Sequence, residues 1–132
     1  MPAKDGETYY LRVGERPSRH IIKVKTAVTE EALKNGLSGR LIMQRGNGLL
    51  FIFPTLAKQS MWMKGMHFPL DIVWLDETFT VRHIVYGAPP CKGSCPSYSS
   101  HYKAQYAIEL NAGDAVAYGF KVGIPLKVVN EA

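Results

Sequence analysis

Alternation of polar and apolar residues is the feature that most limits how this chain can fold, and turn residues interrupt it roughly every eight to fifteen positions. In His20–Val28, for example, apolar and β-branched residues alternate with two lysines, which gives a strand one buried and one solvated face. Leu49–Phe53 is apolar on both faces and predicts a central strand that is covered from two sides. Further strands are predicted at Tyr9–Val13, Ser60–Lys64, Leu70–Leu75, Thr80–Tyr86, Lys103–Leu110 and Leu126–Val129.

One helix is well delimited by its end residues. Thr29 is a good N-cap, two glutamates follow it where the helix dipole favours negative charge, and Lys34 lies near the helix end. Asn35-Gly36 then supplies a left-handed stop. A second, shorter helical turn is expected within Asn111–Gly119. The predicted fold class is therefore α+β, mostly β: a small sandwich or partly open barrel of seven to nine short strands with one or two short helices.

The length of 132 residues suits one domain spanning residues 1–132, of which residues 1–7 are expected to be flexible. With 46% apolar residues the chain can bury a core without a metal or a disulfide, and we predict no cofactor. The polar N-terminus does not have the form of a signal peptide, and the longest apolar run is far below the ~20 residues of a membrane helix. We therefore expect a cytoplasmic protein that does not bind membranes.

The net charge of +5 is concentrated in the first third of the chain. Residues 12–45 hold eight basic and three acidic side chains, and this difference equals the whole net charge. The basic residues are scattered singly, without a basic run or interleaved aromatic residues. Ordinary solvated surface is the better interpretation, so we do not expect nucleic-acid binding.

The segment Met61–Asp76 contains the first candidate site. Asp71 lies among apolar residues, where a carboxylate needs a partner. If Gly65–Pro69 closed a hairpin, Lys64 would lie beside Asp71 across it. The favoured interpretation is structural, either an ion pair or a carboxylate that accepts hydrogen bonds from backbone amides. The alternative is a polar spot in an apolar pocket with Trp62 as one wall.

Glu109 is the second candidate, on the polar face of the predicted strand Lys103–Leu110. Asp71 and Glu109 could converge as an acid/base pair. No spacing rule brings the two carboxylates together, so this is the less favoured hypothesis.

Cys91 and Cys95 lie in Gly87–Ser100, a loop rich in Pro, Gly and Ser. A disulfide, a free dithiol, a zinc site and a nucleophilic cysteine are the alternatives. The spacing is not that of a usual zinc knuckle, two further ligands would be needed, and no base is specified for a nucleophile. A pair that tethers the loop, as disulfide or dithiol, is favoured, and no metal site is predicted.

Several blocks of residues occur in a familiar order: Gly36-Leu37 with Arg40, Gly48-Leu49-Leu50-Phe51, Phe53-Pro54, Trp62-Met63-Lys64, Pro69-Leu70-Asp71-Ile72, Pro90-Cys91, Cys95-Pro96 with Tyr98, Glu109-Leu110 and Ala112-Gly113. From about Val28 to Val129 the chain resembles domain-of-unknown-function family 192, which has bacterial, archaeal and cyanobacterial-phage members. The resemblance implies a small β-rich domain, often exported where a leader is present, and implies no activity. Gly65 stands where many members have Asn, and Leu49 where many have Met.

Three functions are compatible with these features. We favour a non-catalytic binding or interaction module with an unknown small ligand or protein partner. The alternatives are a structural component of a larger assembly, such as a phage particle, and a small hydrolase-like enzyme; an enzyme is the least favoured. The candidate binding residues are Trp62, Lys64, Asp71, Cys91, Cys95, Tyr98 and Glu109.

Overall fold

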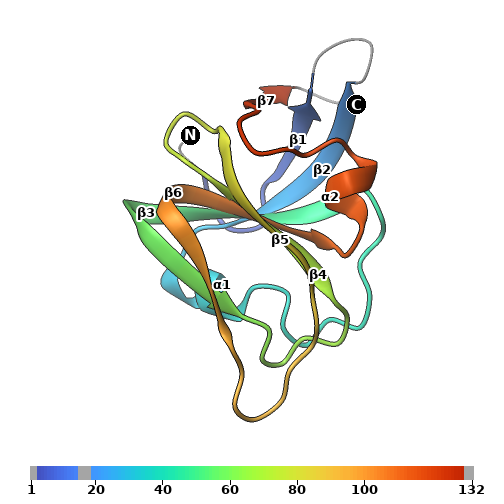
Figure 1. The fold of residues 1–132 in the computed structure, drawn as a ribbon, viewed down its shortest axis with the longest axis vertical. Helices are drawn as coiled ribbons and strands as arrows, with labels where there is room; N and C mark the ends of the chain where they lie inside the picture. Colours follow the sequence, from blue (N-terminus) through green and yellow to red (C-terminus); the bar gives the residue numbers. More distant parts are fainter. Residues whose placement is uncertain (1–2, 15–18, 130–132) are drawn as a thin grey trace.

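A computed structural model describes residues 3–14 and 19–129, which form one seven-stranded sheet with two short helices (Figure 1). The elements are β1 (Thr8–Val13), β2 (His20–Ala27), α1 (Glu30–Asn35), β3 (Asn47–Trp62), β4 (Leu70–Leu75), β5 (Val81–Ala88), β6 (Ser97–Asn111), α2 (Asp114–Ala117) and β7 (Leu126–Val129). The strand order is β5-β4-β6-β3-β2-β1-β7, and the sheet is not closed into a barrel. Among the described residues, an isolated bridge between Thr80 and Pro125 and backbone hydrogen bonds between residues 79–81 and residues 123–126 link its two ends. The predicted mostly-β, α+β class is confirmed.

Two apolar cores lie on opposite faces of this sheet. Successive residues of a strand point to opposite faces, and in β4 Val73 belongs to one core whereas Ile72 and Trp74 belong to the other. Helix α2 contributes Ala115 to the first core, and α1 packs against the second. Neither helix in the described part of the chain is long and apolar enough to cross a membrane.

The expected hairpin between the strands at residues 60–64 and 70–75 is wrong. Strand β6 lies between β3 and β4 and pairs antiparallel with both. Residues 65–69 therefore cross from one side of β6 to the other instead of closing a tight turn. Both edges of β6 are used, since residues between 97 and 110 pair with β3 and residues 106–111 pair with β4.

Strand β3 is longer than predicted, since it joins the two predicted strands Leu49–Phe53 and Ser60–Lys64. Its register against β6 shifts between Ile52 and Ala57, around Pro54. Proline has no N–H to donate to a ladder, so a bulge is where a strand tolerates it. Strand β6 also begins at Ser97, within the segment expected to be loop.

Residues 4–7, which the sequence analysis expects to be flexible, form hydrogen bonds with the end of β2 and the start of α1. The Asp5 carboxylate accepts from the backbone N–H groups of Val28 and Thr29 and from the Thr29 hydroxyl. Hydrogen bonds from Thr29 and Val28 lower the pKa of Asp5. Thr29 in turn accepts from the N–H of Ala32, which confirms it as the N-cap of α1. The start of the helix is thus fixed from two sides.

Candidate functional site

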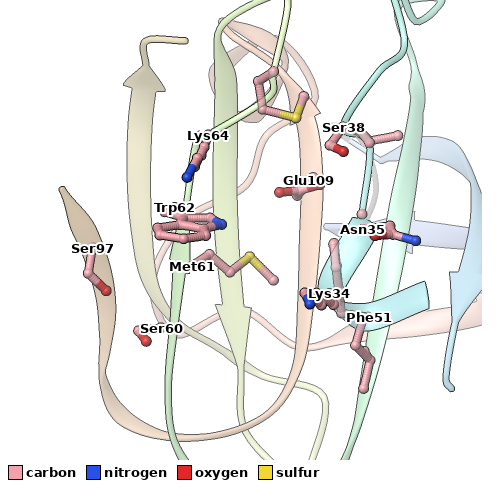
Figure 2. A pocket seen from close by; sticks show the side chains of 14 residues that line it. Lys34, Asn35, Ser38, Phe51, Ser60, Met61, Trp62, Lys64, Ser97 and Glu109 are labelled. Carbon is pink, nitrogen blue, oxygen red and sulfur yellow. The ribbon is translucent and has the colours of Figure 1, made fainter. Parts of the chain in front are cut away.

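A cavity of about 490 Å³ lies between the end of α1, strand β3 and strand β6 (Figure 2). The turn after α1 forms one wall, and the last residues of β3 with the segment that follows form the opposite wall. Its lining combines apolar side chains, small polar side chains and three ionisable groups: Leu33, Lys34, Asn35, Gly36, Leu37, Ser38, Phe51, Ser60, Met61, Trp62, Lys64, Met66, Ser97 and Glu109.

Glu109 comes to the cavity from the centre of the sheet. In β6 it lies opposite Leu49 of β3 on one side and Ile72 of β4 on the other, both of which belong to the core on the α1 face. The alternation in β6 predicts that Glu109 lies on a solvated face, but Glu109 is only 4% exposed. The reason is tertiary, because α1 and the following turn cover this face.

The Glu109 carboxyl group is buried with few hydrogen-bond partners. Burial raises its pKa to about 8, and a hydrogen bond from the backbone N–H of Leu37 offsets this only in part. Its Oε1 has no hydrogen-bond partner among the described residues. Figure 2 shows the carboxyl group pointing into the cavity, toward the wall that carries Met61 and Trp62. With this pKa, Glu109 is mostly protonated at pH 7, and its carboxylic acid can donate one hydrogen bond.

Gly36 allows the turn after α1 to pass close to this carboxyl group. Its φ is +51°, and a Cβ there would lie 3.3 Å from Oε1 of Glu109 and 3.1 Å from Cζ of Phe51. The predicted glycine stop of the helix is confirmed, and it also leaves room at the base of the cavity.

Trp62 and Lys64 form the facing wall. The Trp62 residue is 54% exposed, and Nζ of Lys64 lies 5.2 Å from the centre of its ring. Lys64 is also held by its backbone, through an isolated bridge to Cys91. Two of the predicted site residues are thus brought together with Glu109.

Asp71 lies away from the cavity. Opposite it in β6 is Leu110, the neighbour of Glu109, so the two carboxylates are on opposite faces of the sheet and the converging acid/base pair is wrong. Its carboxylate accepts from the backbone N–H groups of Gly87 at 2.8 Å, Gly113 at 3.0 Å and Ala115 at 2.9 Å. The structural interpretation, with backbone amides as partners, describes these contacts.

Cys91 and Cys95 form a disulfide, so neither is a free nucleophile. The N–H of Cys91 donates to the carbonyl of Met63 at 3.3 Å, which ties the disulfide loop to the segment that carries Lys64. Tyr98 pairs with Met61 in the sheet but does not line the cavity. The described residues hold no cluster of three or more potential metal ligands.

The disulfide leads to a direct prediction. Protein kept without reductant and unfolded in guanidinium should show no thiol by titration, and two per chain after reduction, since the chain has two cysteines. Replacing both by serine should lower the free energy of unfolding by about 2 kcal/mol, because the bond closes only a short loop. Two reactive thiols before reduction would contradict the bonded arrangement.

Sequence reasoning missed the α1 side of the cavity. From the sequence, Lys34 is only a charge that suits the helix end, and Gly36 is only a helix stop. Both lie more than 70 positions before Glu109, and no local pattern connects segments so distant. The alternation in β6 did mark Glu109 as an acid next to a turn, and this was the single available signal.

The open sheet and its cavity define a small, β-rich protein of the α+β class whose candidate site lies on the α1 face. The chain belongs to the DUF192 family, described as "Uncharacterized ACR", whose model matches residues 12–128. The match confirms the resemblance and begins earlier than the expected Val28. None of the curated proteins matches the chain.

The solved structures that are similar to this one include the following two. A "putative transcription regulator" from Sinorhizobium meliloti 1021 has a TM-score of 0.86 and 28% identity, covering 96% of this chain and 98% of that chain. A protein of unknown function from Novosphingobium aromaticivorans DSM 12444 has a TM-score of 0.81 and 23% identity, covering 89% of this chain and 83% of the other. The second likeness shows the shared fold alone.

Proposed function

We propose that this protein is a non-catalytic binding module that holds a small organic ligand in the cavity beside Glu109. The observation that carries the proposal is the unpaired Oε1 of Glu109, a buried polar atom that points into a cavity of about 490 Å³. Leaving such an atom unpaired costs about 1–3 kcal/mol, and a ligand that pairs with it offsets that cost. A concave, largely apolar site with a few polar groups is the usual form of a small-molecule site.

The surroundings of Glu109 favour binding over catalysis. A hydrolase that works with a second carboxylate or with a thiol nucleophile would need that group beside Glu109. Asp71 lies on the opposite face, and the cysteines are bonded to each other. Among the described residues, Glu109 is the only acidic one that lines the cavity.

Binding can be tested with three naphthalene compounds that differ only in their head group: 2-naphthoate, 2-naphthamide and 2-naphthylmethylamine. We expect at least one to shift the indole N–H signal of Trp62 saturably in two-dimensional NMR, because Trp62 lines the cavity. The indole N–H of Trp74, which is fully buried and outside the lining, is the internal reference and should not move.

Ser60→Trp places a large side chain in the cavity lining and should weaken binding at least about tenfold. Thr55→Trp is the matched control, because Thr55 is exposed on the same strand but does not line the cavity. If no compound shifts the cavity signals, or if both variants bind equally well, the cavity is not a binding site.

A further inference from the structure

The ionisable groups that line the cavity carry a net positive charge at pH 7. Lys34 enters from the last turn of α1 and Lys64 from the segment after β3, and Figure 2 shows them on either side of the space that Glu109 faces. Neither lysine forms an ion pair within the described parts of the chain. Glu109 is the third ionisable group, and burial keeps it neutral at pH 7. The cavity therefore has two positive charges without a compensating negative one.

The neighbouring surface adds to this positive potential. A smaller hollow of about 210 Å³ lies on the other side of Leu37, which lines both spaces. Lys23, Lys25 and Arg40 line this hollow, and no acidic residue of the described part of the chain does. Charges gathered around a concave, low-dielectric wall raise the local concentration of ligands of opposite sign.

On the basis of the proposed function, we propose that the ligand is a small organic anion whose oxyanion group is recognised by Lys34, Lys64 and the carboxylic acid of Glu109. The two ammonium groups supply charge and the protonated Glu109 donates a hydrogen bond to an anion oxygen. Hydrogen bonds that involve an ionised partner are roughly twice as strong as neutral ones. The apolar body of the ligand packs against Met61 and Trp62, which line the same space.

Other ligand classes fit these groups less well. A cationic ligand would meet two ammonium groups and would have to ionise Glu109 before it gained a partner. A neutral ligand could accept a hydrogen bond from Glu109 but would form no ion pair with either lysine. An organic anion gains from the positive charge of the two lysines and from the hydrogen bond of Glu109, and for this reason we assign it.

The head-group series tests this assignment. At pH 7, 2-naphthoate should bind at least about tenfold more tightly than 2-naphthamide, and 2-naphthylmethylamine should bind most weakly. In the double variant Lys34→Gln/Lys64→Gln, the preference of the naphthoate over the amide should disappear. Lys58→Gln/Lys103→Gln is the matched control, because it removes the same charge from exposed positions outside the cavity and should keep the preference.

A pH titration tests the part assigned to Glu109. With a pKa of about 8, the protonated fraction falls from about nine-tenths at pH 7 to about one-tenth at pH 9, so the affinity for 2-naphthoate should fall about tenfold. Within residues 3–14 and 19–129, Lys34 and Lys64 are the only other ionisable groups in the lining. Glu109→Gln keeps a hydrogen-bond donor that does not titrate, so this variant should bind at pH 7 and lose far less affinity at pH 9.

The outcomes separate the two proposals. Tighter binding of the amide or the amine at the Trp62 signal would overturn the anion assignment and leave the binding module standing. A naphthoate affinity that is unchanged between pH 7 and pH 9, or that falls equally in Glu109→Gln, would overturn the part given to Glu109. If none of the three compounds shifts the Trp62 signal, both the assignment and the proposed function fail.

Discussion

Replacing Glu109 with glutamine should remove a pH dependence of stability that amounts to about 4 kcal/mol between pH 4.5 and pH 8. The folded protein holds the Glu109 proton up to a pKa of about 8, whereas the unfolded chain releases it near the ordinary value of 4.5. Between these values the unfolded state binds fewer protons, so the free energy of unfolding falls as the pH rises. The cost of burying this acid is thus absent below pH 4.5 and complete above pH 8.

Urea unfolding of the wild type and of Glu109→Gln at pH 5, 7 and 9 measures this effect. The difference between their free energies of unfolding isolates Glu109, because the contributions of the other titrating groups cancel. The stability of Glu109→Gln relative to wild type should increase from pH 5 to pH 9. Glu77→Gln is the control, because Glu77 is exposed and its removal should leave the pH profile parallel to that of wild type. Parallel profiles for wild type and Glu109→Gln would show that the Glu109 pKa is not raised.

Asp71→Asn should lower the free energy of unfolding by about 3 kcal/mol, which corresponds to roughly 10 °C in melting temperature. The Asp71 carboxylate is 1% exposed and accepts from Gly87 at one oxygen and from Gly113 and Ala115 at the other. An asparagine can present only one oxygen to these donors, and its NH₂ group would face at least one of the three backbone N–H groups. Buried donors that lose their acceptor cost about 1–3 kcal/mol each.

The three amides that Asp71 holds come from the end of β5 and from the entry into α2. Thermal and urea unfolding should be measured for Asp71→Asn and for Glu77→Gln. Both variants remove one carboxylate, but Asp71 is buried and Glu77 is exposed. Because Asp71 and the cavity are on opposite faces, Asp71→Asn should keep its naphthoate affinity while it remains folded. A loss of less than about 0.5 kcal/mol would show that these hydrogen bonds contribute little.

The two acids illustrate how far sequence reasoning extends. The sequence singled out both Asp71 and Glu109, because each is a carboxylate in a strand with apolar neighbours. It could not predict that one receives three backbone hydrogen bonds and the other lacks a partner for Oε1. Their partners come from β5, the entry to α2 and the turn after α1, and the chain separations exceed what any local pattern can encode.

Local patterns alone determined most of the elements. The alternation predicted strands that correspond to β1, β2, β4, β5 and β7, and Thr29 with Asn35-Gly36 delimited α1. These signals are local because side-chain periodicity and helix capping involve residues within a few positions of each other. The same alternation identified Leu49–Phe53 as a central strand, and the two cores on either side of it confirm this.

Only the tertiary structure decided where these elements lie relative to one another. The insertion of β6 between β3 and β4 overturned the expected hairpin and put Asp71 and Glu109 on opposite faces. The turn after α1, at Gly36 and Leu37, covers the acid that the alternation predicts to be solvated. The end of α1 and the segment after β3 bring Lys34 and Lys64 to the same cavity. Strand order and the covering of a face depend on contacts between distant segments. The alternation of side chains in one strand specifies that the strand has two faces but not what covers them.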